Sequence, residues 1–145
     1  MAKPYDRKMH SAEHLLNQAM VRRFNCGRCF SAHINPKKSK CDYHFDRPLT
    51  PSEIEAVQED VNQAIDADLP VIIEEMPRED ALKAFNLDRV PDMENMSHFR
   101  VVRMGGYDAC PCIGEHVAST GEIGGFVITS TGFEEDVLRI RFKLK

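Results

Sequence analysis

The chain has 145 residues, of which 42% are hydrophobic and 29% are charged, and its formal net charge is −4. This length and composition predict one globular domain with a substantial hydrophobic core. The polar start of the chain argues against a secretory signal peptide, and no apolar run approaches the roughly 18 residues of a membrane span, so we expect no membrane partner. Five cysteines, an odd number without such a signal, favour reduced thiols in the cytoplasm over a disulfide framework.

Charge is distributed unevenly along the chain. Residues 22–47 carry seven basic side chains and two acidic ones, whereas residues 53–94 carry thirteen acidic and three basic ones. The negative total argues against a general nucleic-acid binder, but the basic stretch could face phosphates beside the first predicted hairpin. A solvated polar loop explains this stretch equally well, so charge alone does not decide between the two.

Residues 7–20 are predicted to form a helix, because they contain no Gly or Pro and their apolar residues recur close to a 3.6-residue period. His10 and His14, four positions apart, would share one helix face, and both imidazoles could reach a single point. Glu13 completes the pattern His-x-x-Glu-His, known from metallohydrolases in which the histidines bind metal and the glutamate moves protons. A surface carboxylate is the alternative interpretation of Glu13.

The middle and end of the chain alternate between strand and helix patterns. Residues 29–34 and 40–45 are predicted strands of a hairpin. A helix is expected from Thr50 to about Ala67, with Thr50 as N-cap, Pro51 at the first helical position and Glu53 three residues after the cap. We expect further strands at residues 70–76, 99–104, 126–129 and 137–144, a short helix at 78–85 and a loop at 86–97. Hairpins with segregated helices favour an α+β domain with a mostly antiparallel sheet.

Cys112 and His116 form a second pair with the same three-residue gap, and Gly114 between them lets the chain fold back. Three imidazoles and one thiolate make a ligand set suited to zinc, so the two pairs predict a zinc site built from both ends of the chain. Four protein ligands would fill a tetrahedron, whereas catalytic zinc usually keeps a position for water or substrate. A loose ligand, a five-coordinate metal or a zinc that only positions substrate would each resolve this tension.

Cys26 and Cys29 form a Cys-x2-Cys pair that Cys41 follows. The pair could mark a separate structural zinc, with His33 or His44 as a further ligand, or a redox pair. Ordinary reduced cysteines in a hairpin are the alternative.

Several short motifs follow one another along the chain: His-x3-His at 10–14, Ser-x-His-Ile at 31–34, Asp-x-x-Phe at 42–45, Arg-Pro-Leu-Thr-Pro-Ser-Glu-Ile at 47–54, Asn-Gln-Ala-Ile at 62–65, Asp-Leu-Pro-Val at 68–71, Cys-x-Gly-x-His-Val at 112–117 and Thr-Gly-Glu-Ile-Gly at 120–124. In this order they resemble the editing domain shared by alanyl- and threonyl-tRNA synthetases, and above all its free-standing relatives, the alanyl-tRNA editing proteins of the AlaX type. The resemblance covers the chain from about residue 8 onwards.

The resemblance implies an α+β fold, that of the synthetase second additional domain, in which the two ligand pairs meet in a cleft between helix and sheet. It also implies hydrolysis of the ester that joins a wrong amino acid, usually serine or glycine, to alanine tRNA. The implied zinc ligands are His10, His14, Cys112 and His116. Ser31 and His33 fall on the strand that faces the metal, so we expect them to contact substrate. With no other synthetase domain attached, residues 1–145 are expected to act in trans as a single editing domain.

Glu115 departs from the family pattern. The family's usual run after the cysteine is Gly-Gly-Thr-His, whereas this chain has Ile113-Gly114-Glu115-His116 and so places a carboxylate where a small hydroxyl is customary. Glu115 could repel a tRNA phosphate, alter the choice of amino acid or move protons. Glu13 and Glu115 are therefore both candidate catalytic residues, in a reaction where zinc acts as Lewis acid or as a source of activated water.

Two other functions fit the same motifs. One is a zinc hydrolase or lyase that acts on a small metabolite, because the family fold is similar to a permuted S-ribosylhomocysteine lyase whose helix also carries His-x-x-Glu-His. The other is a non-catalytic binding module stabilised by zinc, which would unfold with a chelator and turn over no ester.

Overall fold

The computed structural model describes residues 6–85 and 93–145. In this part of the chain, three α-helices and seven strands form an α+β fold with two antiparallel sheets, as the sequence predicts. The elements in chain order are α1 (Arg7–Phe24), β1 (Ser31–His33), β2 (Ser39–His44), α2 (Pro51–Asp66), β3 (Val71–Pro77), α3 (Arg78–Ala84), the 3-10 helix η1 (Met93–Asn95), β4 (His98–Met104), β5 (Asp108–Pro111), the 3-10 helix η2 (Thr120–Ile123), β6 (Phe126–Glu134) and β7 (Val137–Leu144).

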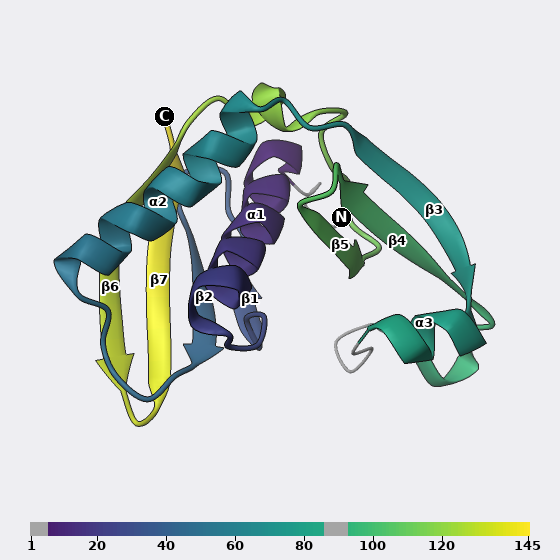
Figure 1. Ribbon diagram of the computed structural model, residues 1–145, viewed down its shortest axis with the longest axis horizontal. Coiled ribbons are helices and arrows are strands. Elements are labelled where there is room, and N and C mark those ends of the chain that lie inside the picture. Colours follow the sequence, from purple (N-terminus) through teal and green to yellow (C-terminus); the bar gives the residue numbers. More distant parts are fainter. Residues whose placement is uncertain (1–5, 86–92) are drawn as a thin grey trace.

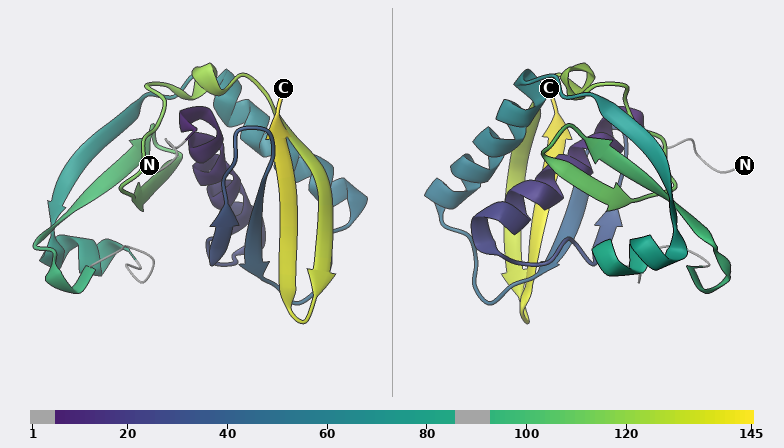
Figure 2. Two further views of the ribbon diagram at one scale, coloured as in Figure 1. Left: turned by 180° about the vertical axis from the view of Figure 1, so that it is seen from behind. Right: turned by 45° about the vertical axis from the view of Figure 1, so that its right-hand side comes forward.

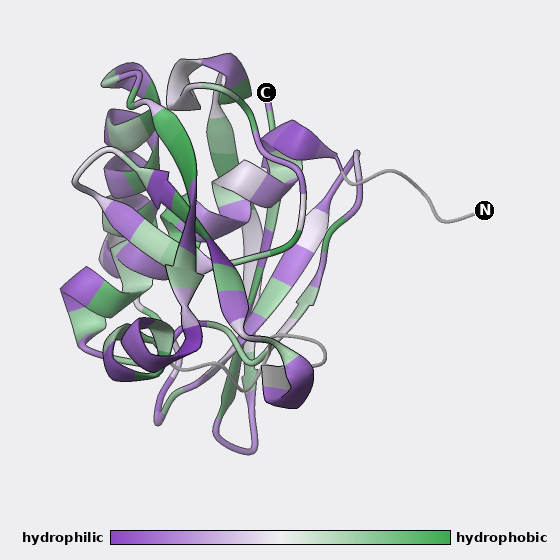
Figure 3. Ribbon diagram, turned by 90° about the vertical axis from the view of Figure 1, so that its right-hand side faces the viewer, coloured by the Kyte–Doolittle hydropathy of each residue, from purple (hydrophilic) through white to green (hydrophobic). Residues whose placement is uncertain are grey.

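The first sheet has the strand order β1-β2-β7-β6, and α1 and α2 lie on one of its faces (Figure 1). Side chains alternate between the two faces of a strand, and Figure 3 shows hydrophobic and hydrophilic residues alternating along the ribbons. The side chains of Cys41, Tyr43, Leu138, Ile140 and Phe142 are completely buried beneath the helices. The charged residues of β2 and β7 occupy the alternate positions, so they lie on the outer face of this sheet.

The second sheet has the strand order β3-β4-β5, and α1 lies between the two sheets (Figure 2). Helix α3 closes the far end of β3 and β4, where Ala81 and Phe99 form a small separate core. Gly105 turns the chain from β4 into β5 with a φ of 54°, a left-handed conformation that glycine adopts without strain. This turn brings β5, and the residues after it, back against α1.

Helix α2 begins as its sequence predicts. The Thr50 hydroxyl accepts a hydrogen bond from the Glu53 amide, and the Glu53 carboxylate accepts one from the Thr50 amide, so both arms of a capping box are present. Val57, Val61 and Ile65 are buried on the face that packs against the core. The helix thereby holds β6 and the last turns of α1 in place.

Several boundaries differ from the sequence prediction. Helix α1 runs four residues further, to Phe24, and β6 continues through polar residues to Glu134 because its pairing with β7 outweighs weak local strand propensity. The short strand β5 and the helix η2 were not predicted. Of the loop expected at 86–97, residues 86–92 lie outside the described residues, and 93–95 form η1. None of the described helices is long and apolar enough to cross a lipid bilayer.

Candidate metal centre

Helix α1 presents His10 and His14 from its first two turns. Asp6 caps the helix, because its carboxylate accepts a hydrogen bond from the Met9 amide at 2.8 Å. The two histidines are one turn apart on a buried face, and their ring centroids are 5.2 Å apart. The helix therefore fixes two imidazoles side by side in a site largely closed to water.

The segment after β5 brings Cys112 and His116 to the same place. Arg100 on β4 anchors this segment, since its guanidinium donates hydrogen bonds to the carbonyls of Cys112 at 2.8 Å and Gly114 at 2.6 Å. A Cβ atom at Gly114 would lie 2.2 Å from Cε1 of His10, so only glycine allows the segment to approach the helix this closely.

The four predicted ligand residues converge. The candidate ligand atoms of His10, His14, Cys112 and His116 all lie within 4.8 Å of one another. The ring of His116 is 4.4 Å, centroid to centroid, from each of the other two imidazoles. Three nitrogen donors and one sulfur donor in this arrangement are compatible with a zinc ion.

The three imidazoles share one orientation relative to the protein. Nδ1 of His10 lies 3.3 Å from the Glu115 carbonyl oxygen, Nδ1 of His116 lies 3.0 Å from the Ser11 hydroxyl, and Nδ1 of His14 lies 3.5 Å from a carboxylate oxygen of Asp108. Each ring thus turns Nε2 towards the centre of the cluster. Nε2 of His116 is buried and has no hydrogen-bond partner among the described residues. Such outer contacts are those that orient metal-ligating histidines, so the residues fit a bound metal.

Asp108 on β5 connects His14 to a wider network that the sequence analysis missed. Its carboxylate accepts hydrogen bonds from Arg28 at 2.6 Å and from Gln18 at 2.9 Å. Burial opposes the charge of this group, but His14 and Arg28 hold the pKa of Asp108 well below its usual range. At 3.5 Å its contact with His14 is an ion pair rather than a short hydrogen bond. A polar residue four positions before Cys112 in an otherwise apolar strand was the available signal.

The charges in the cluster suit metal ligands. Burial works to raise the pKa of Cys112, but its contacts with His10, His116 and His14 lower it to about 3, so the sulfur is a thiolate. Burial lowers the pKa of His116 to about 4, which keeps this imidazole neutral. Burial also works to lower the pKa of His14, yet Asp108 and the Cys112 sulfur raise it to about 9. The negative groups that raise this pKa would equally favour a cation at the centre.

The two candidate catalytic carboxylates occupy different surroundings. Glu13 is buried, with one oxygen 3.7 Å from Nε2 of His10 and the other accepting hydrogen bonds from Asn17 and Cys29. The side chain of Glu115 is 59% exposed and forms an ion pair with Arg7, so only its backbone carbonyl contacts the cluster. The alternative of a surface carboxylate therefore describes Glu115 and not Glu13.

Ser31 and His33 lie outside the cluster. In the strand register they stand opposite Asp42 and Lys40, on the outer face of the first sheet, whereas Ala32 between them stands opposite the buried Cys41. The structure therefore does not bring these two side chains to the four ligand residues.

The Cys-x2-Cys pair is split between two environments. The Cys26 thiol donates a hydrogen bond to the Met20 carbonyl, while Cys29 joins Cys41 and Glu13 in a second, fully buried group. Neither His33 nor His44 belongs to that group.

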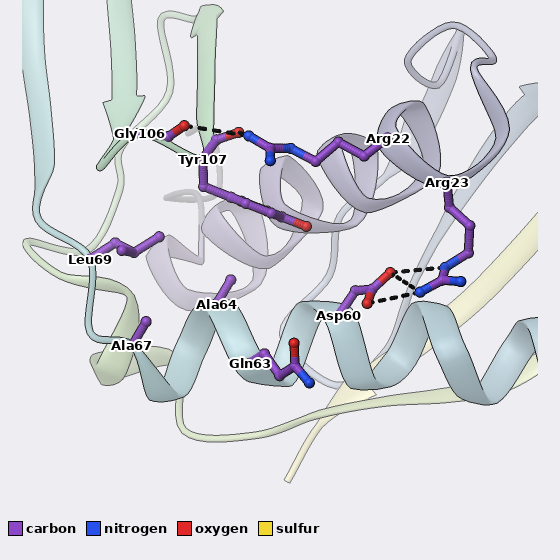
Figure 4. Close-up of a pocket in the computed structure, with 9 residues that line it drawn as sticks. All are labelled: Arg22, Arg23, Asp60, Gln63, Ala64, Ala67, Leu69, Gly106 and Tyr107. Atoms are coloured by element: carbon purple, nitrogen blue, oxygen red, sulfur yellow. Dashed lines mark hydrogen bonds and ion pairs between the residues drawn. The ribbon is translucent and has the colours of Figure 1, made fainter.

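A pocket of about 720 Å³ lies at the other end of α1 (Figure 4). The Arg22 guanidinium lies over the Tyr107 ring on one side of it, and Arg23 pairs with Asp60 on another. None of the four ligand residues lines this pocket. The candidate metal centre is therefore the cluster of three histidines and Cys112, and this pocket is separate from it.

Fold and cluster together define an α+β domain with three histidines and one cysteine gathered between a helix and the segment after a strand. The family described as the threonyl and alanyl tRNA synthetase second additional domain matches residues 99–140, which include Cys112 and His116. The chain is 36% identical over 134 residues to the alanine–tRNA ligase of Coxiella burnetii, a match that covers 90% of the chain and 15% of that enzyme. The chain belongs to this family, as its motifs predict.

Two further relatives extend the match to both kinds of synthetase. The alanine–tRNA ligase of Treponema denticola is 33% identical over 126 residues, 82% of the chain and 20% of the enzyme. The threonine–tRNA ligase of Symbiobacterium thermophilum is 28% identical over 131 residues, 83% of the chain and 20% of the enzyme. The chain thus spans between 15% and 20% of the length of these three relatives.

Proposed function

We propose that residues 1–145 form a single zinc-dependent editing domain that hydrolyses the ester of a mischarged tRNA. One observation carries the proposal: three imidazoles, each with Nδ1 within 3.5 Å of a protein oxygen, turn Nε2 towards the Cys112 thiolate in a chain that belongs to a tRNA synthetase family. Under this proposal, His10, His14, Cys112 and His116 hold the metal. The domain would act on tRNA in the cytoplasm.

A zinc ion bound at this place would supply Lewis-acid polarisation or a water of lowered pKa. The protein's own contribution is to fix the ligands. Ser11 and Asp108 hold two of the rings from behind, and Arg100 holds the backbone of the segment that carries Cys112. An aminoacyl ester is already a reactive acyl compound, so positioning with one proton-transfer group would suffice for its hydrolysis.

We assign the proton transfer to Glu13. Its carboxylate is buried and lies beside the metal-facing nitrogen of His10, where a proton released from water could be accepted. Asn17 fixes the carboxylate, because its amide donates to one Glu13 oxygen while its own carbonyl accepts from the Tyr43 hydroxyl and the Cys29 amide. Glu115, exposed and paired with Arg7, is better placed to influence which tRNA end approaches the site.

The proposed substrate is alanine tRNA that carries serine or glycine. Many of the chain's matches are alanine–tRNA ligases, and a site that hydrogen-bonds the serine hydroxyl discriminates strongly against alanine, which lacks it. Ser31 and His33 remain predicted substrate contacts, although their side chains lie on the outer face of the sheet.

The decisive experiment measures deacylation of alanine tRNA charged separately with serine, glycine or alanine. We expect the seryl or glycyl ester to be hydrolysed faster than the alanyl ester, and Cys112→Ala to abolish the difference. If the protein accelerates none of the three over buffer, the proposed function is wrong. Equal activity on a small amino-acid ester or thioether, without affinity for tRNA, would instead favour a zinc hydrolase or lyase of small metabolites. One tightly bound zinc without any turnover would favour a non-catalytic binding module.

A further inference from the structure

The outer face of the first sheet carries a row of basic side chains. In the strand register, His33 on β1 stands opposite Lys40 on β2, and Lys40 stands opposite Arg141 on β7. These three residues thus line up across three adjacent strands, about 5 Å apart from strand to strand. Lys143 lies two positions beyond Arg141 on the same face. Helices α1 and α2 both cover the opposite face of this sheet (Figure 1).

This row is electrostatically unfavourable for the protein alone. Like charges directly opposite each other in a sheet are destabilising, and within the described residues Lys40, Arg141 and Lys143 form no ion pair with an acidic side chain. The neighbouring row differs, because the Asp42 carboxylate there receives two hydrogen bonds from Arg139, at 2.8 and 2.9 Å. Lys40 and His33 also help to lower the pKa of Asp42, but the ion pair of this carboxylate is with Arg139, so Lys40, Arg141 and Lys143 together keep a net positive charge.

The row lies at the same end of the molecule as the metal centre. Cys41 on β2 is grouped with Glu13, and Tyr43, two residues later, bonds to Asn17, so β2 and α1 advance in the same direction. Lys40 therefore lies level with the first turns of α1, which carry His10. The turn between β1 and β2, with Lys37 and Lys38, lies at this end as well (Figure 2).

Further along the same face of β2, an aromatic pair is available. The rings of Phe30 and His44 stack with centroids 4.0 Å apart and planes 14° apart, and both residues are exposed. Cations beside exposed flat rings match the surfaces on which RNA phosphates and unpaired bases are held. An acidic protein could pair its carboxylates with the same cations, but it would offer no unpaired bases to stack on the two rings.

We infer that the row formed by His33, Lys40 and Arg141, extended by Lys143, binds the phosphate backbone of RNA next to the end that enters the metal centre. This inference rests on the proposed function and names the surface by which its tRNA substrate is held. Lys40 belongs to the basic stretch at residues 22–47, whereas Arg141 and Lys143 lie on the C-terminal strand β7. Only the pairing of β2 with β7 brings these distant parts of the chain side by side.

The test is a binding titration of uncharged alanine tRNA against wild type, Lys40→Gln and the double variant Lys40→Gln/Lys143→Gln, over a series of salt concentrations. Lys83→Gln is the matched control, because Lys83 is an exposed lysine on α3, far along the chain from the row, and its loss changes the net charge equally. We expect the double variant to bind about tenfold more weakly and each lost contact to reduce the salt slope of log K by about 0.7–0.9. Thermal unfolding of Lys40→Gln should be unchanged or shifted slightly upward, since a like-charge pair is removed.

Two results would overturn the inference. One is an affinity and salt slope equal to wild type, or changed as much by Lys83→Gln as by Lys40→Gln. The other is binding to vesicles of phosphatidylcholine and phosphatidylserine at a salt concentration where tRNA does not bind. Because uncharged tRNA needs no hydrolysis, this titration can succeed even if every deacylation assay fails, and the two proposals are judged separately.

Discussion

Helix α1 contributes to two groups of metal-type donors, and the contrast between them shows what makes one a candidate metal centre. On one side stand three imidazoles and the Cys112 thiolate; on the other, Glu13, Cys29 and Cys41 form a group of similar size. In the second group the donors bond to the protein: the Cys29 thiol donates a hydrogen bond to the Glu13 carboxylate, which also accepts one from the Asn17 amide. In the first group Nδ1 of each ring lies against a protein oxygen, and Nε2 faces the other members of the group.

The lesson is that residue type and spacing are insufficient to identify a metal site. A thiol that donates a hydrogen bond is not a thiolate, and a carboxylate already satisfied by two donors gains less from a cation. The first group combines an ionised sulfur with three imidazole nitrogens that face it.

The largest effect on zinc content should come from exchanging the sulfur of Cys112 for oxygen. Cys112→Ser removes the thiolate and should reduce the zinc content of purified protein from one ion per chain to almost none. Cys110→Ser is the matched control, because burial raises the pKa of Cys110 to about 12 and its side chain remains a thiol outside the cluster. Metal analysis of both variants checks this. Equal zinc content in the two proteins would contradict the assignment of Cys112 as a ligand.

Glu13→Gln tests the carboxylate that lies between the two groups. The amide keeps the size of the side chain but cannot accept a proton, so deacylation should slow by about 10²–10⁴-fold while zinc content stays near wild type. Single-turnover hydrolysis of charged tRNA, with metal analysis on the same samples, measures both quantities. Glu115→Gln is the comparison, and its rate should stay much closer to wild type because its carboxylate is exposed. If Glu115→Gln is the slower enzyme, the two roles are reversed.

Asp108→Asn tests the support behind His14. Removing this charge should weaken zinc binding by about 10–100-fold, because the imidazole loses the group that orients it and favours its positive polarisation. Competition with a chromophoric chelator gives the affinity. Asp60→Asn serves as a control, since it breaks an ion pair with Arg23 that has no contact with the cluster. The assignment fails if both variants bind zinc as tightly as wild type.

Sequence patterns predicted the residues that have strong local or periodic signals. The 3.6-residue apolar period of α1, the capping box at Thr50 and the alternation in β7 each determine an element by short-range chemistry, and the structure confirms those elements. The pairing of His10 and His14 with Cys112 and His116 was predictable because equal three-residue gaps suit one metal. The family resemblance, carried by many weak motifs in a fixed order, was confirmed as well.

Contacts between distant segments were beyond the reach of the sequence. Asp108 and Arg28 are eighty positions apart, and the aspartate supports His14 only after β5 returns against α1. The division into two sheets and the short strand β5 follow from pairings that local propensity does not encode. The register also places Ser31 and His33 on the outer face, a fact that depends on β1 being paired with β2 rather than on the motif itself.

The smallest effect is a pH dependence of the chelator-treated protein. The pKa values of Cys112 and His116 fall on folding, from 9.0 to about 3 and from 6.5 to about 4. Between pH 6.5 and 4 the unfolded chain therefore binds about two more protons at these groups than the native protein, and stability should fall as the pH is lowered. His14, raised to about 9, is protonated in both states in this window and adds no slope.

Above pH 6.5 the contribution of His116 ends and that of His14 begins, with the opposite sign. Stability from the lowered Cys112 pKa still rises with pH up to about 9, while stability from the raised His14 pKa is lost over the same interval, so the two slopes cancel and the curve should be flat. Urea unfolding at a series of pH values measures this profile. In Cys112→Ser the acid slope should drop to about one proton, the share of His116. An unchanged slope in that variant would show that the Cys112 sulfur is not ionised in the native protein, and the contrast between the two groups of donors would then be lost.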